Sequence, residues 1–157
     1  MEPIKEVEFE RLYNSPVEML WRAWTDPEQL KQWWGPDNVS IPECQVDLRV
    51  GGRIYIVMEA GEAMGPYKGT RWPMEGEYNV VDENSRLIYT AKAWTEGKRE
   101  TTEIDQVTEV YLDGDNHQTR LKVKAIVNGV GPDAKYAVEG MQYGFNQQLD
   151  KLTLFLG

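Results

Sequence analysis

The sequence predicts a single α+β domain, residues 1–157, in which a curved seven-stranded antiparallel sheet wraps around one long C-terminal helix. Three observations support this prediction. Two short helical segments follow the first strand, an apolar period of two then continues for about ninety residues, and a helical period returns at the C-terminal end. With 157 residues and 41% hydrophobic side chains, the chain has the size and composition of one globular domain.

The first predicted element is a strand from Ile4 to Tyr13, in which apolar and acidic residues alternate. A capping box follows at residues 15–18, with Ser15 as the N-cap and Pro16 at the first helical position. It predicts a first helix, whose apolar side is formed by Val17, Leu20, Trp21 and Trp24.

A second short helix is predicted directly after the first. Either Thr25 or Asp26, with Pro27, repeats the start signal, and Gly35-Pro36 ends the helix. Because almost no linker separates the two helices, they must meet at a sharp angle.

From Val39 onward the pattern is that of a sheet. The predicted strands are Val39 to Asp47, Arg53 to Glu59, Pro73 to Asp82, Ser85 to Trp94, Asp105 to Leu112 and Gln118 to Asn128. Most connections between them are short and rich in turn residues, which predicts antiparallel neighbours in a meander. The connection from Ala60 to Arg71 is longer and glycine-rich, and it predicts a mobile loop.

The chain ends in a predicted amphipathic helix. Apolar residues recur there at steps of three and four: Met141, Phe145, Leu149, Leu152 and then Phe155 or Leu156.

This order of elements poses a geometric problem, because a curved sheet of seven strands encloses more volume than one helix fills. Either large side chains fill the gap or a pocket remains. The residues that we expect to line such a pocket are Trp33, Trp34, Tyr55, Val57, Tyr78, Tyr89, Trp94, Met141, Phe145 and Leu149. Core packing is the alternative role for the aromatic members. Adjacent helical residues point about 100° apart, so we expect at most one of Trp33 and Trp34 to face the pocket.

Several segments together resemble a known family. They are residues 15–28 (SPVEMLWRAWTDPE), 33–36 (WWGP), 47–53 (DLRVGGR), 75–78 (EGEY), 86–90 (RLIYT) and 144–156. In this order they resemble the helix-grip superfamily, which includes START lipid-transfer domains and the major pollen allergens. Within it, the chain is similar to the branch named after the activator of the heat-shock protein 90 ATPase.

The resemblance implies the helix-grip fold over nearly the whole chain, but it does not select one function. Similar proteins include ligand carriers, polyketide cyclases, antibiotic self-protection proteins and chaperone cofactors, and fold does not fix function. The eponymous activator also has a separate N-terminal domain, to which no part of these 157 residues corresponds. Direct chaperone activation is therefore not expected.

Charge and composition exclude several partners. The formal net charge is −9 and the 17 basic residues are scattered, so we expect neither nucleic-acid binding nor attraction to anionic membranes. No stretch approaches the roughly 20 apolar residues that span a bilayer, and the N-terminus has no secretory signal pattern. Cys44 is the only cysteine, which favours a cytoplasmic location. A homodimer is one of the oligomeric states that the sequence leaves open.

Few residues point to catalysis, a metal or a cofactor. His117 is the only histidine, and it falls in a predicted hairpin turn. One His and one Cys without compact ligand spacing do not make a zinc site, so we expect no metal and no cofactor. Cys44 is expected to be a buried, inert thiol, because no basic neighbour in the sequence would lower its pKa.

Three hypotheses about function remain open. The leading one is a non-enzymatic binder of a small hydrophobic or aromatic molecule, with the loop from Ala60 to Arg71 gating entry. The second is a cyclase-like or hydrolase-like enzyme, which would use inward-facing Arg53, Glu59, Glu75, Glu77 and tyrosines. The third is a chaperone cofactor or protein-interaction module, which predicts a filled core and an exposed apolar patch.

Overall fold

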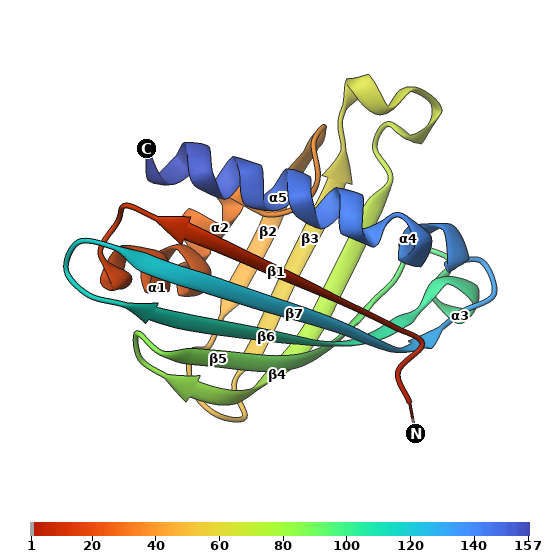
Figure 1. Cartoon of the computed structure of the whole chain (residues 1–157). Helices are drawn as coiled ribbons and strands as arrows, with labels where there is room; N and C mark the ends of the chain where they lie inside the picture. Colours follow the sequence, from red (N-terminus) through yellow and green to blue (C-terminus); the bar gives the residue numbers. More distant parts are fainter. Residues whose placement is uncertain (1) are drawn as a thin grey trace.

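The computed structural model describes residues 2–157 and contains one antiparallel sheet of seven strands (Figure 1). The strands are β1 (Lys5–Tyr13), β2 (Val39–Val46), β3 (Arg53–Ala60), β4 (Arg71–Asp82), β5 (Arg86–Ala93), β6 (Ile104–Gly114) and β7 (Thr119–Val130). Their order in the sheet is β1-β7-β6-β5-β4-β3-β2. Strands β2 to β7 therefore form a meander, and β1 adds to it beside β7.

In the described part of the chain, five α-helices accompany the sheet, and the two that follow β1 and the long C-terminal one cover one of its faces (Figure 1). They are α1 (Val17–Thr25), α2 (Pro27–Trp33), α3 (Arg99–Thr102), α4 (Lys135–Glu139) and α5 (Met141–Leu156), with a 3-10 segment, η1 (Glu62–Tyr67), between β3 and β4. The predicted fold class and the predicted order of strand, two helices, six strands and long helix are confirmed. The short elements η1, α3 and α4 are additions that the sequence patterns did not indicate. None of the helices within residues 2–157 is long and apolar enough to cross a membrane.

The two helix starts differ in how they are capped. Asp26, one of the two predicted residues, caps α2, with its Oδ1 accepting a hydrogen bond from the Glu28 N–H at 2.9 Å. The predicted capping box of α1 is wrong, because Pro16 takes the N-cap position and no side-chain cap bond forms. Tertiary contacts with the β6–β7 hairpin take over this role. The Val17 N–H donates to the Asp115 carbonyl (2.9 Å), and the Ser15 carbonyl accepts from Thr119 Oγ1 (2.8 Å).

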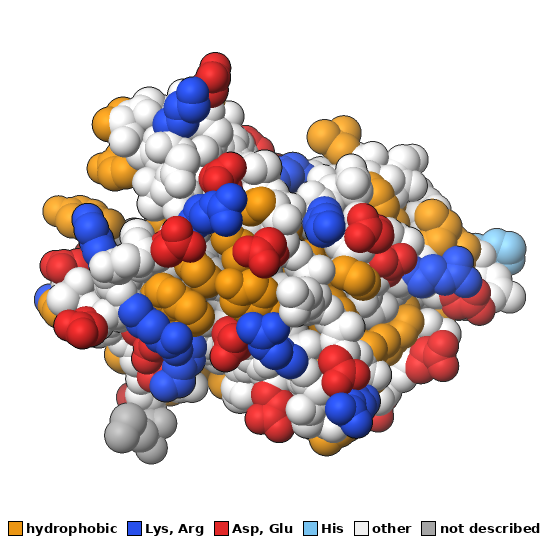
Figure 2. All heavy atoms as spheres, turned by 180° about the vertical axis from the view of Figure 1, so that it is seen from behind, with side chains coloured by type: hydrophobic (Ala, Val, Ile, Leu, Met, Phe, Trp, Pro, Cys, Tyr) orange, Lys and Arg blue, Asp and Glu red, His pale blue; other side chains and the backbone are white. Residues whose placement is uncertain are grey.

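The two faces of the sheet differ sharply. The inner face is apolar and packs on α1, α2 and α5, with Ile54, Ile56, Leu87, Leu121 and Val123 all at most 1% exposed. The outer face carries charged side chains of both signs, with apolar residues between them on the side that Figure 2 shows. Between β1 and β7 these charges form cross-strand ion pairs: Glu6–Lys124, Glu8–Lys122 and Glu10–Arg120. Arg120, Lys122 and Lys124 therefore lie on the solvent face of β7.

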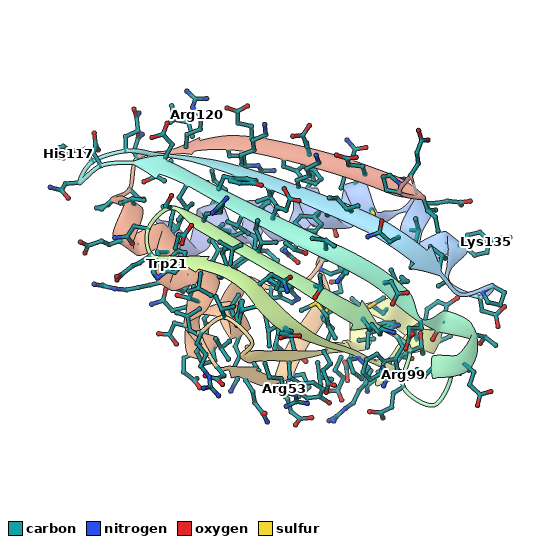
Figure 3. The ribbon with its side chains drawn as sticks, turned by 90° about the horizontal axis from the view of Figure 1, so that it is seen from below. Trp21, Arg53, Arg99, His117, Arg120 and Lys135 are labelled. Atoms are coloured by element: carbon teal, nitrogen blue, oxygen red, sulfur yellow. The ribbon has the colours of Figure 1, made fainter. Side chains whose placement is uncertain are left out.

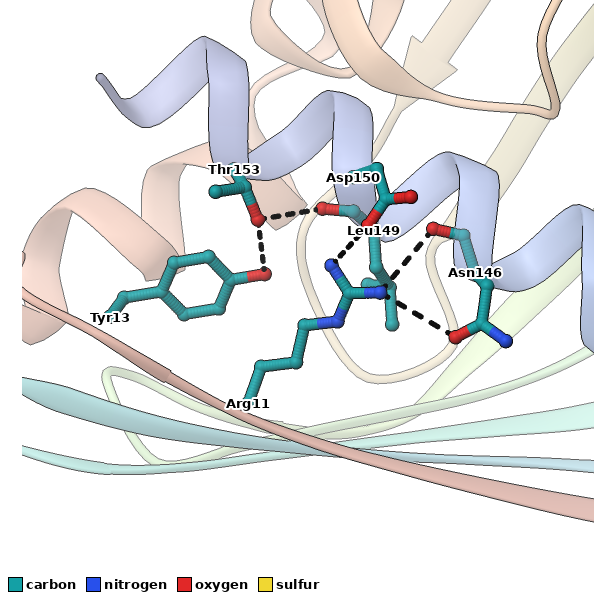
Figure 4. A network of polar contacts seen from close by, with 6 residues as sticks. All are labelled: Arg11, Tyr13, Asn146, Leu149, Asp150 and Thr153. Carbon is teal, nitrogen blue, oxygen red and sulfur yellow. Dashed lines mark hydrogen bonds and ion pairs between the residues drawn. The ribbon is translucent and has the colours of Figure 1, made fainter.

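Polar contacts hold α5 on both of its flanks. Toward β1, Arg11 donates to Asp150 (2.8 Å) and Tyr13 contacts Thr153 (3.4 Å), as Figure 4 shows. Toward the α2–β2 connection, Gln148 Oε1 accepts from the Gly35 N–H at 2.8 Å. Lys151 Nζ donates there to three backbone carbonyls, at Trp34, Gly35 and Pro36. The helix therefore bridges the edge strand β1 and the end of α2, and closes the concave side of the sheet.

Candidate functional site

The expected pocket residues divide into three groups in the structure. The first group lies deep in the core between sheet and helices: Trp33, Trp34, Tyr78, Tyr89 and Leu149, none more than 8% exposed. The Trp24 ring packs edge-on against two others. Its centroid lies 4.7 Å from that of Trp33, the last residue of α2, and 6.1 Å from that of Trp34, the C-cap residue. Both Trp33 and Trp34 enter the core, because the helix ends at Trp33 and the extended backbone of Trp34 turns its ring back.

The second group lies on the outer face, so the expectation that it lines the interior is wrong. Tyr55 and Val57 alternate with the inward-facing Ile54 and Ile56, and Trp94 follows the inward-facing Ala93. The Arg53 guanidinium lies 4.4 Å from the Tyr55 ring centroid, and that of Arg99 lies 3.8 Å from the Trp94 ring centroid. Strand β3 is apolar on both faces over residues 54–58, which is why a period of two could not select the inner one.

The third group is Met141 and Phe145 of α5, which are only half-buried. Phe145 stacks on Phe9 of β1 with ring centroids 5.2 Å apart. Four residues that the sequence analysis missed face the same region from the ends of β3 to β6: Met58, Trp72, Ala93 and Ile104. Each of them is also half-buried, although strand alternation directs it inward. Met58 lies two positions from the inward-facing Ile56, and Trp72 lies two positions from the inward-facing Met74. Strand alternation could therefore have indicated these two residues from the sequence.

The interior therefore has a fully buried end and a partly exposed end, which we name the closed end and the open end. The closed end, between α1, α2 and the C-terminal half of α5, is filled by side chains at most 1% exposed: Leu20, Trp24, Leu30, Trp33, Leu149 and Leu152. The open end, at the N-terminal half of α5, is lined by the half-buried Met58, Trp72, Ala93, Ile104, Met141 and Phe145. Of these, Met58, Ala93, Met141 and Phe145 pack against the buried core while solvent still reaches them. Clustered apolar side chains that solvent reaches are typical of binding sites.

Between these two ends the inner surface of the sheet carries several small side chains, together with the larger Met74 and Gln106, which are the register partners of Ala93 and Ala91 and contact each other. Gly76 of β4 is the register partner of Ala91 of β5, and Ala125 of β7 is that of Thr108 of β6. An added Cβ at Gly76 would lie only 2.8 Å from the Ala91 Cβ. This strip, with Ala93, connects the open end to the Tyr78–Tyr89 pair.

Four buried polar atoms along the interior have no hydrogen-bond partner within the described protein: Trp24 Nε1, Tyr78 Oη, Tyr89 Oη and Gln148 Nε2. Their residues are at most 5% exposed. An unsatisfied buried polar group costs about 1–3 kcal/mol, so native proteins contain few of them. Thr108 is the register partner of Tyr89, but no hydrogen bond of ordinary geometry joins the two hydroxyls.

Burial keeps the ionisable groups of this region neutral. Desolvation raises the pKa of both Tyr78 and Tyr89 well above the ordinary tyrosine value. It also raises the pKa of the Cys44 thiol to about 11, with a smaller opposing effect of Lys31. The prediction that Cys44 is an inert thiol agrees with this environment. At neutral pH the tyrosines can therefore donate a hydrogen bond from an intact hydroxyl.

The charged residues of the enzyme hypothesis lie on the opposite side of the sheet. Arg53 pairs with Glu75 at 2.6 Å, and Arg71 pairs with Glu59 at 2.9 Å. Figure 3 shows Arg53 on the outer side of the molecule, away from α5. An open groove of about 430 Å³ lies here, lined by residues that include Arg53, Glu75 and Glu77. These charged groups are not positioned to act together on a molecule held between the sheet and α5.

His117 and the acidic residues around it belong to the β6–β7 hairpin tip (Figure 3). The side chain of Asp115 accepts hydrogen bonds from the backbone N–H groups of His117 and Gln118, which lowers the pKa of its carboxyl. Residues 2–157 contain no cluster of three or more His, Cys, Asp or Glu side chains that could hold a metal ion. The hairpin acidic residues thus shape a turn.

Exposed apolar side chains bear on the interaction hypothesis. The helical segment α4–α5 presents Tyr136, Tyr143 and Leu154 to solvent, at 87%, 72% and 81% exposure. They lie at positions 136, 143 and 154, so they are spread along the whole helical segment. No feature of the described surface specifies a partner for them.

Comparisons with known proteins agree with this fold. The sequence model described as "Activator of Hsp90 ATPase homolog 1-like protein" matches residues 14–157. No curated protein matches the chain. A crystal structure from Nitrosomonas europaea is 29% identical, with 96% of this chain and 93% of that chain covered and a TM-score of 0.74.

More distant structures share the fold alone. A protein from Chromobacterium violaceum is 23% identical, with 97% of each chain covered and a TM-score of 0.75. One from Silicibacter pomeroyi is 22% identical, with 96% of each chain covered and a TM-score of 0.73. The family match covers nearly the whole chain, and the protein belongs to the family of activator of Hsp90 ATPase homolog 1-like proteins.

Proposed function

We propose that this protein binds a small hydrophobic or aromatic molecule between the sheet and α5. The observation that carries the proposal is the open end of the interior, where six inward-directed apolar residues are only half-buried. Burial of apolar surface contributes about 25 cal/mol per Å² of favourable free energy. A ligand that covers these side chains therefore gains binding free energy, and the side chains of the closed end need not move.

The β3–β4 connection supports a route of entry at this end. It projects beyond the sheet next to the ends of β3 and β4, where Met58 and Trp72 lie (Figure 1). Gly65 and Gly69 in this segment have positive φ, and an added Cβ at either glycine would meet no atom within 4 Å. Loose packing of this kind suits a segment that moves, and the segment is part of the proposal as the gate.

The expected location of the protein is part of the same proposal. A chain with a single cysteine, here a half-buried thiol, suits a reducing compartment. We therefore place the ligand among molecules of the cytoplasm.

Native mass spectrometry of protein purified from its own host tests the proposal directly. A mass excess that disappears on denaturation would support it and identify the ligand. Fluorescence titration with 1-aminoanthracene, an apolar probe, gives an affinity where no ligand is retained. If the probe does not bind and no mass excess is found, the proposal is wrong.

Two phenylalanine substitutions locate the binding region. Ala93→Phe adds bulk at the open end and is expected to weaken probe binding at least about tenfold. Thr90→Phe adds comparable bulk on the outer face of the same strand and should leave the affinity unchanged. The opposite result, with only Thr90→Phe weakening the affinity, would move the binding region to the outer groove, whose lining includes Thr90.

A further inference from the structure

We infer that the ligand carries a hydrogen-bond-accepting oxygen, such as a ketone or ether oxygen, and that the hydroxyls of Tyr78 and Tyr89 donate to it. This inference rests on the proposed function and specifies the chemical class of the molecule: an apolar body of one or two rings with an acceptor at its inner end.

The two tyrosines are arranged as a pair. Tyr78 of β4 and Tyr89 of β5 are direct register partners, and their rings meet edge-to-face with centroids 5.9 Å apart. They are 0% and 1% exposed, and neither hydroxyl makes a hydrogen bond of ordinary geometry with the protein. Thr108 lies near enough to the Tyr89 hydroxyl to oppose, in small part, the rise of its pKa. In a core that needed only bulk at these positions, phenylalanine would supply it without the cost of two unsatisfied hydroxyls.

The unpartnered atoms of the interior are donors as a set. Trp24 Nε1 and Gln148 Nε2 can only donate, and the two tyrosine hydroxyls can donate while they keep their protons. The remaining unpartnered atoms, Asn84 Oδ1 and Asp105 Oδ1, belong to the β4–β5 turn and to the outer face of β6. A molecule that brings acceptors can therefore pair with all four groups, whereas one that brings only donors can pair only with the two tyrosine oxygens.

The distance from the open end to the pair limits the length of the ligand. Along β5, the inward positions run from Ala93 at the open end through Ala91 to Tyr89. Four residues of strand correspond to about 13 Å. Ala93, Ala91, Gly76 and Thr108 are small, whereas Met74 and Gln106, the register partners of Ala93 and Ala91, are larger. A ligand that reaches the tyrosine pair therefore packs against these two side chains. A flat molecule of about two fused rings, with its oxygen innermost, matches this span.

A pair of probes with the same shape tests the inference. The probes are 2-acetylnaphthalene, which has an acceptor oxygen, and 2-isopropylnaphthalene, which has none. By isothermal titration calorimetry the wild-type protein is expected to bind the ketone about tenfold more tightly, as two hydrogen bonds to otherwise unpartnered donors would give. The infrared carbonyl band of the bound ketone should also move to lower wavenumber than in an apolar solvent.

Variants assign the effect to the two hydroxyls. The double variant Tyr78→Phe/Tyr89→Phe should bind both probes with the affinity that the wild type has for the hydrocarbon, and the carbonyl shift should disappear. Tyr55→Phe, which removes a tyrosine hydroxyl on the outer face, should leave both affinities unchanged. The thermal midpoint of each variant establishes that it is folded.

The possible outcomes separate the two proposals. Equal affinity of the wild type for both probes would overturn this inference and leave the proposed function standing. A preference for the ketone that survives in the double variant would also overturn it. If neither probe binds to the wild type, the proposed function and the inference both fail.

Discussion

The closed and the open ends of the interior are built from the same kinds of residue but differ in what covers them. At the closed end, α1, α2 and the C-terminal half of α5 enclose Trp24, Trp33 and Leu149 completely. At the open end, the N-terminal half of α5 leaves Trp72, Met141 and Phe145 half-exposed. The same type of side chain is therefore fully buried at one end and partly exposed at the other.

Truncation of one tryptophan at each end should give the largest difference. Trp33→Ala removes a fully buried ring and its 3.0 Å hydrogen bond to the Ala23 carbonyl, and is expected to cost about 3–5 kcal/mol of unfolding free energy. Trp72→Ala at the open end should cost about 1–2 kcal/mol and weaken probe binding instead. Urea denaturation of both variants measures this contrast, and equal losses of stability would contradict the division into two ends.

Alkaline pH should weaken the region around the tyrosine pair. In the unfolded chain Cys44 ionises near pH 9 and the tyrosines near pH 10, whereas burial raises the pKa of Cys44 to about 11 and those of Tyr78 and Tyr89 further. Above pH 9 the unfolded state thus holds fewer protons than the folded state, and the unfolding free energy falls as pH rises. Below pH 9 these groups give no pH dependence.

Thermal midpoints between pH 8 and pH 11 test this expectation. The triple variant Cys44→Ala/Tyr78→Phe/Tyr89→Phe should show a shallower decline than the wild type. Part of the decline should persist, because the pKa values of Tyr13 and Tyr111 are also raised. An identical slope in both proteins would mean that these three groups titrate normally in the folded state.

Removal of single hydroxyls should change the unfolding free energy differently for a hydroxyl that has a hydrogen-bond partner and for one that has none. Tyr89→Phe removes a hydroxyl without a partner, and should leave stability unchanged or raise it by about 0.5–1 kcal/mol. Thr119→Val removes an equally buried hydroxyl that donates to the Ser15 carbonyl, and should cost about 1–2 kcal/mol. If Tyr89→Phe is as costly as Thr119→Val, the Tyr89 hydroxyl has a structural partner after all.

The smallest effect is expected from the ion pair that joins α5 to β1. Arg11 Nη1 lies 2.8 Å from Asp150 Oδ1, but the Asp150 side chain is 68% exposed. Asp150→Asn should therefore lower the unfolding free energy by no more than about 0.5 kcal/mol, with the difference disappearing at high salt. A loss above about 2 kcal/mol would indicate that this contact, and not the apolar core, fixes the helix. Differential scanning calorimetry at low and high ionic strength makes the measurement.

Most of the fold could be predicted from local patterns. The alternation in Ile4 to Tyr13, the Asp26-Pro27 start signal and the apolar steps from Met141 to Leu152 each specify an element by its own periodicity. The predicted cap at Ser15 was wrong because a distant hairpin supplies the partner for the Val17 N–H. A capping box describes only local bonds, so it could not anticipate this contact.

The candidate site could be predicted only in part, for a similar reason. Tyr78, Tyr89, Met141 and Phe145 do face the interior, whereas Tyr55, Val57 and Trp94 lie outside it. In β3, five consecutive apolar residues leave the inward face undefined, and the choice depends on which face α5 covers.

The sequence by itself determined the type and order of the main elements, the family and the apolar character of the interior, because periodicity and turn chemistry act over a few neighbouring residues. Only the tertiary structure decided which face of each strand is enclosed, that one end of the interior is filled and the other open, and that two tyrosine hydroxyls meet without a partner. These properties depend on the register between strands and on the position of α5, which residues more than 100 positions apart establish together, such as Gly35 with Gln148 and Arg11 with Asp150.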